Sequence, residues 1–290
     1  MHPSARVNLN DLGSILEWLI GQWWVWAIVG VVVLFFVVVW LLPDAKVVPS
    51  ADFSTTDTEA NEIALGYMQI SNLPSGPWND PTAPGIGDRE KKQLADQWGL
   101  HSRQDWLDNI ERLTTVRRRR DPWVISLQLR ADLAAQLGRV PKTKEWTTAI
   151  VEAGGNKRDA RTFVAAIEHI EGQVRKLAGK DIVPADAFVK TLDGYALGQA
   201  VALATWGVAL GYGDVAEARQ LIHRINVEGR PAFGSWVDFG LSYIAGRVMH
   251  WSDGNIGDKT FDKLGDNWSD LKAACTEKRN GPWATLSWKL

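Results

Sequence analysis

The stretch "FGSWVDFGLSYIAGRVMHW", residues 233–251, has the residue spacing that decides the fold class. Ser235 is a typical helix N-cap, and Asp238 three residues later gives a weak form of the capping box. Beyond this cap the large side chains recur at intervals of three and four residues, which is the period of one helix face. The residues on that face are Trp236, Phe239, Tyr243, Arg247 and His250. The stretch therefore predicts a helix that carries an arginine on an aromatic face.

Arg247 has two interpretations, and the sequence leaves both open. In the first, which we favour, its guanidinium is buried, pairs with a carboxylate and stacks on Trp or Tyr, so that it fixes the packing. In the second, it anchors an anion in a pocket lined by Tyr243 and His250. The second interpretation makes Arg247, Tyr243, His250 and Asp238 weak catalytic candidates. The sequence contains no nucleotide-binding glycine motif, zinc-protease motif or nucleophile elbow that would supply a stronger catalytic set.

Helical patterns continue on both sides of this stretch. Residues 101–116, 121–138, 156–179 and 214–225 each combine a helix start signal with apolar residues at helical spacing. Alternating strand patterns are nearly absent. We therefore predict an all-α fold, with a compact multi-helix globular domain over residues 89–290.

One further helix, within residues 192–214, differs from the others because it is apolar nearly all round. It presents small residues on one face, and these are Gly198, Ala202, Thr205 and Ala209. Such a helix is typical of the centre of a domain, where neighbours pack closely against its small side. A second membrane span is the less favoured interpretation, since glycines interrupt a short segment.

Residues 18–42 read "WLIGQWWVWAIVGVVVLFFVVVWLL" and contain no charged residue. A helix of this length would span about 37 Å, against roughly 30 Å for the hydrocarbon core of a bilayer. Tryptophans stand near both ends, as in the aromatic belts of membrane helices. They are Trp18, Trp23, Trp24, Trp26 and Trp40. We predict one N-terminal transmembrane helix, preceded by a tail over residues 1–17.

Two alternatives to this span are disfavoured. A cleaved signal peptide would need a basic start, a shorter apolar core and a small-residue cleavage site, and a soluble buried helix would rarely be so apolar. The orientation in the membrane is nearly undetermined by charge, because Arg6 and the α-amino group on one side oppose Lys46 on the other. Residues 43–88 are predicted to form a tether with one short helix, capped by Thr56, and a loop rich in Pro and Gly.

Composition excludes several classes of function. The net charge of −2 argues against nucleic acid as a partner. The single cysteine, Cys275, excludes an intramolecular disulfide and a cysteine-based metal cluster. No histidine pattern indicates a metal ligand set, so we predict neither metal nor cofactor. The run Arg117 to Arg120 is the strongest local charge feature. It is interpreted first as a solvated helix end and second as a contact for anionic lipid or a partner.

The segments "TWGVALGY" (205–212) and "SWVDFGLSYIAGR" (235–247) resemble the bacterial domain of unknown function 1266 family. The matching positions of the second segment are Ser235, Trp236, Phe239, Ser242, Tyr243, Gly246 and Arg247. "QWGLHSRQDWLDNIERL" and "NGPWATLSW" are similar to the family's early and closing segments, so the resemblance covers about residues 63–288. It implies a helical, largely cytosolic domain without an assigned activity.

The chain departs from the family pattern at polar positions. Where relatives tend to carry one Asp and two Arg on the central helix, this sequence has Ala196, Gln199 and Thr205. The resemblance therefore implies that a polar site formed by those residues in relatives is mostly absent here.

Our first hypothesis is a non-enzymatic, single-pass membrane protein whose helical domain is an interaction or accessory module. Its partners would be membrane lipids, through the span, and a membrane protein. The alternative is a membrane-associated hydrolase or transferase acting on an envelope substrate, and a remote third is a secreted effector. The anchorless and cytosolic character of the resembling family favours a cytoplasmic domain at the cell membrane.

Overall fold

The computed structural model describes residues 31, 47–71, 73 and 76–290. The regular structure of these residues is helical and includes no strand, which confirms the predicted all-α class. None of the helices among them is both long enough and apolar enough to cross a bilayer. The predicted tail over 1–17 and the predicted span over 18–42, with its five tryptophans, lie outside the described residues except for Val31.

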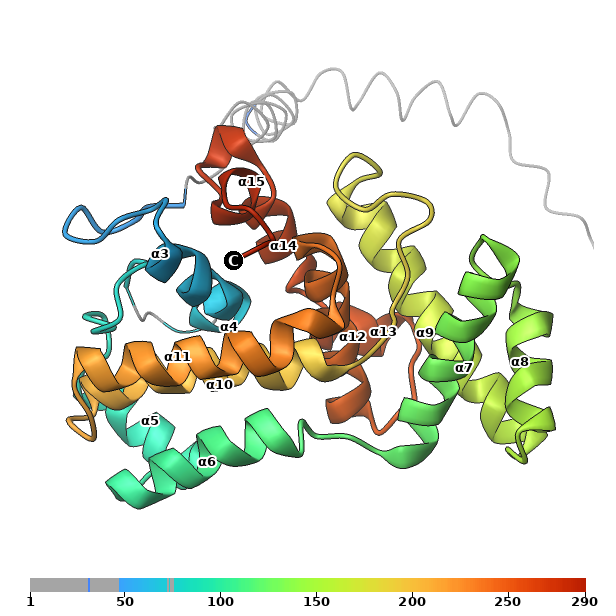
Figure 1. Cartoon of the computed structure of the whole chain (residues 1–290), viewed down its shortest axis with the longest axis horizontal. Helices are drawn as coiled ribbons and strands as arrows, with labels where there is room; N and C mark the ends of the chain where they lie inside the picture. The colour runs from blue at the N-terminus through green and yellow to red at the C-terminus, as the bar shows by residue number, and fades with distance from the viewer. Residues whose placement is uncertain (1–30, 32–46, 72, 74–75) are drawn as a thin grey trace, which may run out of the picture. The chain divides into compact units, whose positions relative to one another are not determined.

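Lys46–Leu290 form one compact unit, and Figure 1 shows the course of its helices. In chain order the elements are α3 (Thr58–Ile63), η1 (Ala64–Gly66), α4 (Tyr67–Ile70), α5 (Asp88–Trp98), α6 (Arg103–Thr115), α7 (Asp121–Leu137), α8 (Thr143–Glu152), α9 (Lys157–Ala178), α10 (Asp193–Ala209), α11 (Val215–Gly229), η2 (Arg230–Ala232), α12 (Trp236–Ser252), α13 (Asp258–Leu264), α14 (Trp268–Ala274), η3 (Glu277–Arg279) and α15 (Pro282–Thr285).

Helix α10 is the centre of the unit. Every residue from Asp193 to Gly207 is buried, because α6, α11 and α12 pack around the helix together with η1 and α4. Figure 1 shows α10 lying along α11, with α6 following the same pair. The prediction of a central buried helix within 192–214 is confirmed.

The close approach of α12 to α10 depends on glycine. A Cβ at Gly194 would lie 2.8 Å from the backbone nitrogen of Tyr243, and a Cβ at Gly198 would lie 2.9 Å from the Tyr243 ring. The predicted face of small residues is therefore confirmed at Gly198. Gly194 also meets α12 closely, although the prediction did not include it. Thr205, which we expected on that face, donates its hydroxyl hydrogen to a carbonyl of its own helix.

The residues before α5 are part of the core rather than a tether. Ala64, Leu65 and Met68 are fully buried, since η1 and α4 pack on α10 while α3 packs on α11. The compact unit begins at Lys46, so these residues fold together with the residues 89–290 that we predicted as a domain. The buried stripe is divided among three short elements, so the sequence shows no long helical period there.

The start of α3 also differs from the prediction by one residue. Asp57, and not Thr56, is the N-cap, and its carboxylate accepts a hydrogen bond of 2.7 Å from the Ala60 amide. Asp and Thr both cap helices, so the sequence pattern alone does not distinguish adjacent candidates.

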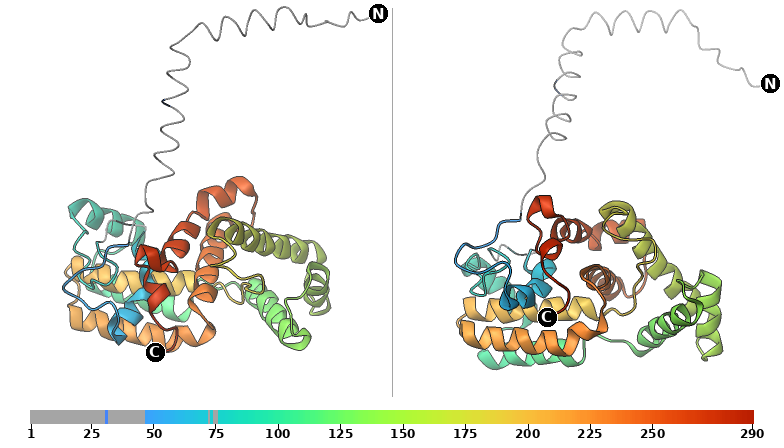
Figure 2. Two further views of the ribbon diagram at one scale, coloured as in Figure 1. Left: turned by 90° about the horizontal axis from the view of Figure 1, so that it is seen from above. Right: turned by 45° about the horizontal axis from the view of Figure 1, so that its top comes forward.

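Helices α7, α8 and α9 pack together at one side of α12 and α14, as both views of Figure 2 show in green and olive. Their centre holds an ion pair between Arg130 and Glu171, with side chains only 2% and 7% exposed. Arg130 lies 4.3 Å from the Trp146 ring centroid, and the Trp146 indole donates to the Ser126 carbonyl at 2.7 Å. Both terminal nitrogens of Arg130 and the indole nitrogen of Trp146 thus donate hydrogen bonds inside an apolar cluster.

The closing segment of the chain completes the core around η2. The guanidinium of Arg230 lies against two indole rings, 4.5 Å from the ring centroid of Trp236 and 4.4 Å from that of Trp288. The Trp283 indole donates to the Ala64 carbonyl at 2.9 Å, across 219 positions of sequence. Residues near both ends of the unit therefore share one aromatic cluster.

Candidate functional site

A cavity of about 810 Å³ lies where α4, α5, α6, α10, α12 and α13 meet. Its walls carry guanidinium, aromatic and amide side chains, with few aliphatic ones. The lining residues are Arg112, Arg118 and Arg247; Trp98, Tyr195, Trp206 and Trp251; Gln69, Gln93, Gln97 and Gln199; and Leu73, Leu264 and Asp266. We name it the arginine cavity. Its volume is in the range of small-molecule sites.

Arg118 reaches the cavity because the chain turns sharply after α6. Arg117 and Arg118 both have left-handed backbone conformations, with φ values of 53° and 51°. Left-handed conformations are uncommon for residues with a Cβ, and a pair in succession is held only when its side chains are well bound. The turn directs neighbouring guanidinium groups to different partners.

The Arg118 guanidinium is held by neutral groups. Its Nε donates to Gln199 Oε1 at 2.8 Å, and one terminal nitrogen lies 2.9 Å from Nε2 of His250. It also lies 5.8 Å from the Trp98 ring centroid and 5.6 Å from that of Tyr195. Because arginine only donates, Nε2 of His250 accepts and the ring proton is on Nδ1.

Arg118 differs from its neighbours in having no acidic partner among the described residues. Burial, together with the nearby Arg112, lowers the pKa of Arg118. Burial of His250, together with the charges of Arg118 and Arg120, lowers the pKa of this histidine. The neutral ring is therefore favoured as the acceptor. A partly buried cation without a counter-ion thus lines the arginine cavity.

The adjacent arginines are neutralised within the fold. Asp193, at the start of α10, has a side chain only 3% exposed and pairs with Arg117 at 3.2 Å and with Arg119 at 2.5 Å. Hydrogen bonding to Asp193 raises the pKa of Arg119. Arg120 pairs with Asp253 and lies over the Trp123 ring. Contact of this run with anionic lipid or a partner stays a prediction.

Two further guanidinium groups enter the cavity from other helices. Arg112 on α6 donates to the Asn109 side chain at 2.5 Å. Arg247 on α12 donates through Nε to the Leu264 carbonyl at 3.0 Å, and lies 3.7 Å from a carboxylate oxygen of Asp266. Asp266 is the one carboxylate in the described lining and is 63% exposed. The charged groups of the cavity are therefore predominantly positive.

The aromatic wall ends in an exposed tryptophan. Trp251 is 62% exposed, and its indole nitrogen donates to the Tyr195 hydroxyl at 2.9 Å. Trp98 and Trp206 make an edge-on contact with ring centroids 6.4 Å apart. The hydrogen bond holds the Trp251 ring in place at the rim while its surface stays open to solvent.

The four weak catalytic candidates do not form one site. Arg247 lines the arginine cavity, and His250 holds Arg118 beside it. Tyr243 is fully buried beneath the cavity, and its hydroxyl donates to Gln69 at 2.7 Å. Asp238 is at the far end of α12, where it pairs with Lys190 at 2.9 Å. The carboxylate that we expected to pair with Arg247 is that of Asp266, in the loop after α13.

Most of the cavity was missed because its residues show no common local spacing. A signal was nevertheless present, since several quoted segments each contribute at least one lining residue. Trp98, Arg118, Trp206 and Arg247 come from "QWGLHS", the arginine run, "TWGVALGY" and "SWVDFGLSYIAGR". Of the three polar positions that depart from the family pattern, Gln199 lines the cavity.

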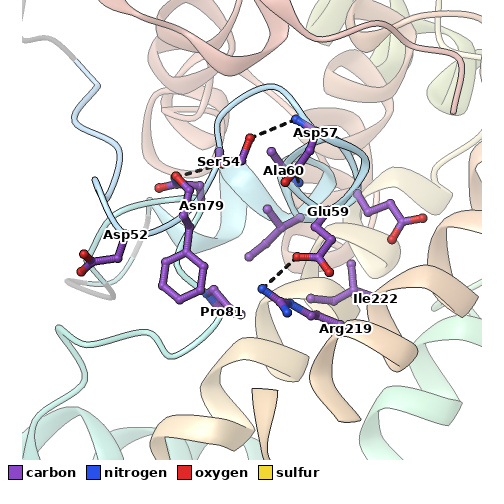
Figure 3. A pocket seen from close by; sticks show the side chains of 12 residues that line it. Asp52, Ser54, Asp57, Glu59, Ala60, Asn79, Pro81, Arg219 and Ile222 are labelled. Atoms are coloured by element: carbon purple, nitrogen blue, oxygen red, sulfur yellow. Dashed lines mark hydrogen bonds and ion pairs between the residues drawn. The ribbon is translucent and has the colours of Figure 1, made fainter. Parts of the chain in front are cut away.

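A smaller cavity of about 250 Å³, shown in Figure 3, lies between α3 and α11. Its polar groups largely bind one another. Arg219 pairs with Glu59 at 2.8 Å, and the Asn79 amide donates to the carbonyls of Phe53 and Ser54. These contacts connect the segment before α3 to the domain, so we assign this cavity a structural role.

The fold and the arginine cavity define a helical domain with a positively charged, aromatic-lined pocket. The chain belongs to the family described as "Protein of unknown function (DUF1266)", whose sequence model matches residues 93–288. This confirms the resemblance, although the match begins later than the residue 63 that we predicted. No curated protein and no solved structure matches the chain.

Proposed function

We propose that this domain is a binding module and that the arginine cavity takes an anionic ligand. The observation that carries the proposal is Arg118, a partly buried cation held by Gln199 and His250 without an acidic partner among the described residues. Desolvation of a cation costs free energy unless an opposite charge compensates it. A bound anion would supply that charge.

The ligand chemistry follows from the guanidinium groups. Planar guanidinium forks match carboxylate and phosphate oxygens in pairs of parallel hydrogen bonds. Arg112, Arg118 and Arg247 line the cavity from three different segments, so more than one guanidinium group is available to an anion.

Binding is favoured over catalysis by the composition of the described lining. It has no Ser, Thr, Cys or Lys, and its one carboxylate, Asp266, stands beside Arg247 near solvent. Nucleophilic and general acid–base mechanisms need a reactive group within hydrogen-bond reach of a base. A hydrolase or transferase activity on an envelope substrate would need groups that this lining does not offer.

The proposal includes attachment of the module to the cell membrane through residues 18–42, with the domain on the cytoplasmic side and a membrane protein as partner. It is supported by an uncharged segment of sufficient length to cross a bilayer and by the tryptophans at its ends. A reporter fused after residue 290 that is active only when exported would contradict the cytoplasmic orientation.

The test of anion binding is calorimetry on the full chain in detergent with phosphate, pyrophosphate, sulfate and citrate. We expect at least one of them to bind the wild type, and Arg118→Met to abolish the heat of binding. Arg161→Met is the matched control, because Arg161 is exposed on α9 and does not line the cavity. No binding of any anion, or equal binding by Arg118→Met, contradicts the proposal.

A further inference from the structure

We infer that the ligand of the arginine cavity is a mononucleotide, with its phosphate at the guanidinium groups and its base against the aromatic wall. This inference rests on the proposed anion-binding function and adds the identity of the ligand class. Three observations carry it, and they concern the phosphate end, the base end and the amide between them.

Arg118 is held in a fixed position in which it can bind the phosphate. Two hydrogen bonds and two aromatic faces fix its guanidinium, so little side-chain freedom is lost when an anion binds. Arg112 and Arg247 add two cations, against the single carboxylate of Asp266. An excess of guanidinium groups suits a phosphate monoester, which carries up to two negative charges at neutral pH.

The base end is the rim tryptophan. Trp251 is 62% exposed but is held by its hydrogen bond to the Tyr195 hydroxyl. An exposed large aromatic ring that is fixed in position is a stacking surface for a planar base. An inorganic anion or a sugar phosphate would leave this surface unused.

Gln199 supplies a directed hydrogen-bond donor inside the cavity. Its side chain is buried, and the Nε–H of Arg118 can only donate, which assigns the amide oxygen to that bond. The amide nitrogen then has no hydrogen-bond partner among the described residues, and Gln199 lines the cavity. An amide hydrogen at the cavity surface can donate to a ring nitrogen or a carbonyl of a base.

Calorimetry on the full chain in detergent tests the inference, with the 5′-monophosphates of adenosine, guanosine, cytidine and uridine as probes. Ribose 5-phosphate and pyrophosphate are the probes without a base. We expect at least one nucleotide to bind about tenfold more tightly than ribose 5-phosphate, as stacking would provide. Trp251→Leu should remove this difference, whereas Arg118→Met should abolish binding of nucleotide and pyrophosphate alike.

The outcomes distinguish the nucleotide assignment from the proposed anion-binding function. Nucleotides that bind no better than ribose 5-phosphate, or a preference that survives Trp251→Leu, overturn the nucleotide assignment and leave anion binding standing. Failure of every phosphate to bind overturns the nucleotide assignment, and failure of sulfate and citrate as well overturns anion binding. Because Trp251 is largely exposed, its substitution should leave the fold intact, and an unchanged thermal transition of Trp251→Leu checks this.

Discussion

Arg118 is partly buried and Arg130 is almost fully buried, and their partners differ. Arg130 has Glu171 as a buried partner, whereas Arg118 has neutral acceptors only. Loss of one partner of a buried ion pair leaves an uncompensated charge, while loss of an unpaired buried cation also removes a desolvation cost. The two arginines therefore allow function and stability to be separated.

We expect Arg118→Met to change the free energy of unfolding by no more than about 1 kcal/mol, because the lost hydrogen bonds and the relieved desolvation offset each other. Arg130→Met should destabilise the protein by about 3–5 kcal/mol. Urea denaturation of both variants measures the difference. Equal losses for the two substitutions would show that Arg118 is a structural residue.

His250 gives the fold a defined dependence on pH. Its pKa in the folded state is lowered by burial, then by Arg118 and Arg120, so the unfolded chain binds the proton more readily. Stability attributable to this histidine is therefore present above its ordinary pKa of about 6.5 and is lost as the pH falls below it.

His250→Gln provides an acceptor for Arg118 that does not titrate. We expect the stability difference between wild type and His250→Gln to shift against the wild type as the pH falls from neutral to acid. Urea midpoints measured for both proteins across that range test the expectation. Parallel curves would mean that the protonation of His250 is not coupled to folding.

At the scale of elements, the crossing of α10 and α12 is the most restricted contact. A Cβ on Gly194 would meet backbone atoms of α12 at 2.8 Å, and backbone cannot move aside as a side chain can. Gly172 on α9 has nothing within 4 Å of the corresponding position. Packing thus requires the glycine at Gly194 in α10, but it does not require the glycine at Gly172 in α9.

Gly194→Ala should destabilise the protein by at least about 1–3 kcal/mol through overpacking. Gly172→Ala should stabilise it by about 0.5–1 kcal/mol, because alanine is the better helix former. Thermal unfolding of both variants distinguishes the two signs. Tolerance of Gly194→Ala would show that α10 and α12 can separate without cost.

The same scale explains how far the sequence could predict this molecule. Helices with long apolar stripes, such as α9 and α12, were predicted, and α12 with its N-cap Ser235, because period and capping are local. The inward turn at Arg117 and Arg118 was not, since it depends on Asp193, 74 or more positions away. The arginine cavity was missed for a related reason. Arg247 was a candidate from the sequence, but Arg112 and Trp251 can be recognised as cavity residues only once the arrangement of the separate helices is known.

At the scale of the whole unit, the segment before α5 is required for the core. We expect a chain that starts at Lys46 to unfold cooperatively, and one that starts at Arg89 to lack a cooperative transition. The shorter chain would expose the surfaces of α10 and α11 that cover Ala64, Leu65 and Met68. Circular dichroism during urea titration measures both, and a cooperative transition in the shorter chain would contradict this view of the core.

The aromatic cluster around Arg230 has a consequence for when the protein folds during its synthesis. Ala64 meets the indole of Trp283 only after 219 further positions have been made, and Trp236 needs Trp288 to enclose Arg230. A ribosome-bound chain that still lacks residues 283–288 would leave this cluster open to water. We therefore expect force measurements on stalled nascent chains to detect completion of the fold only after those residues have emerged from the ribosome.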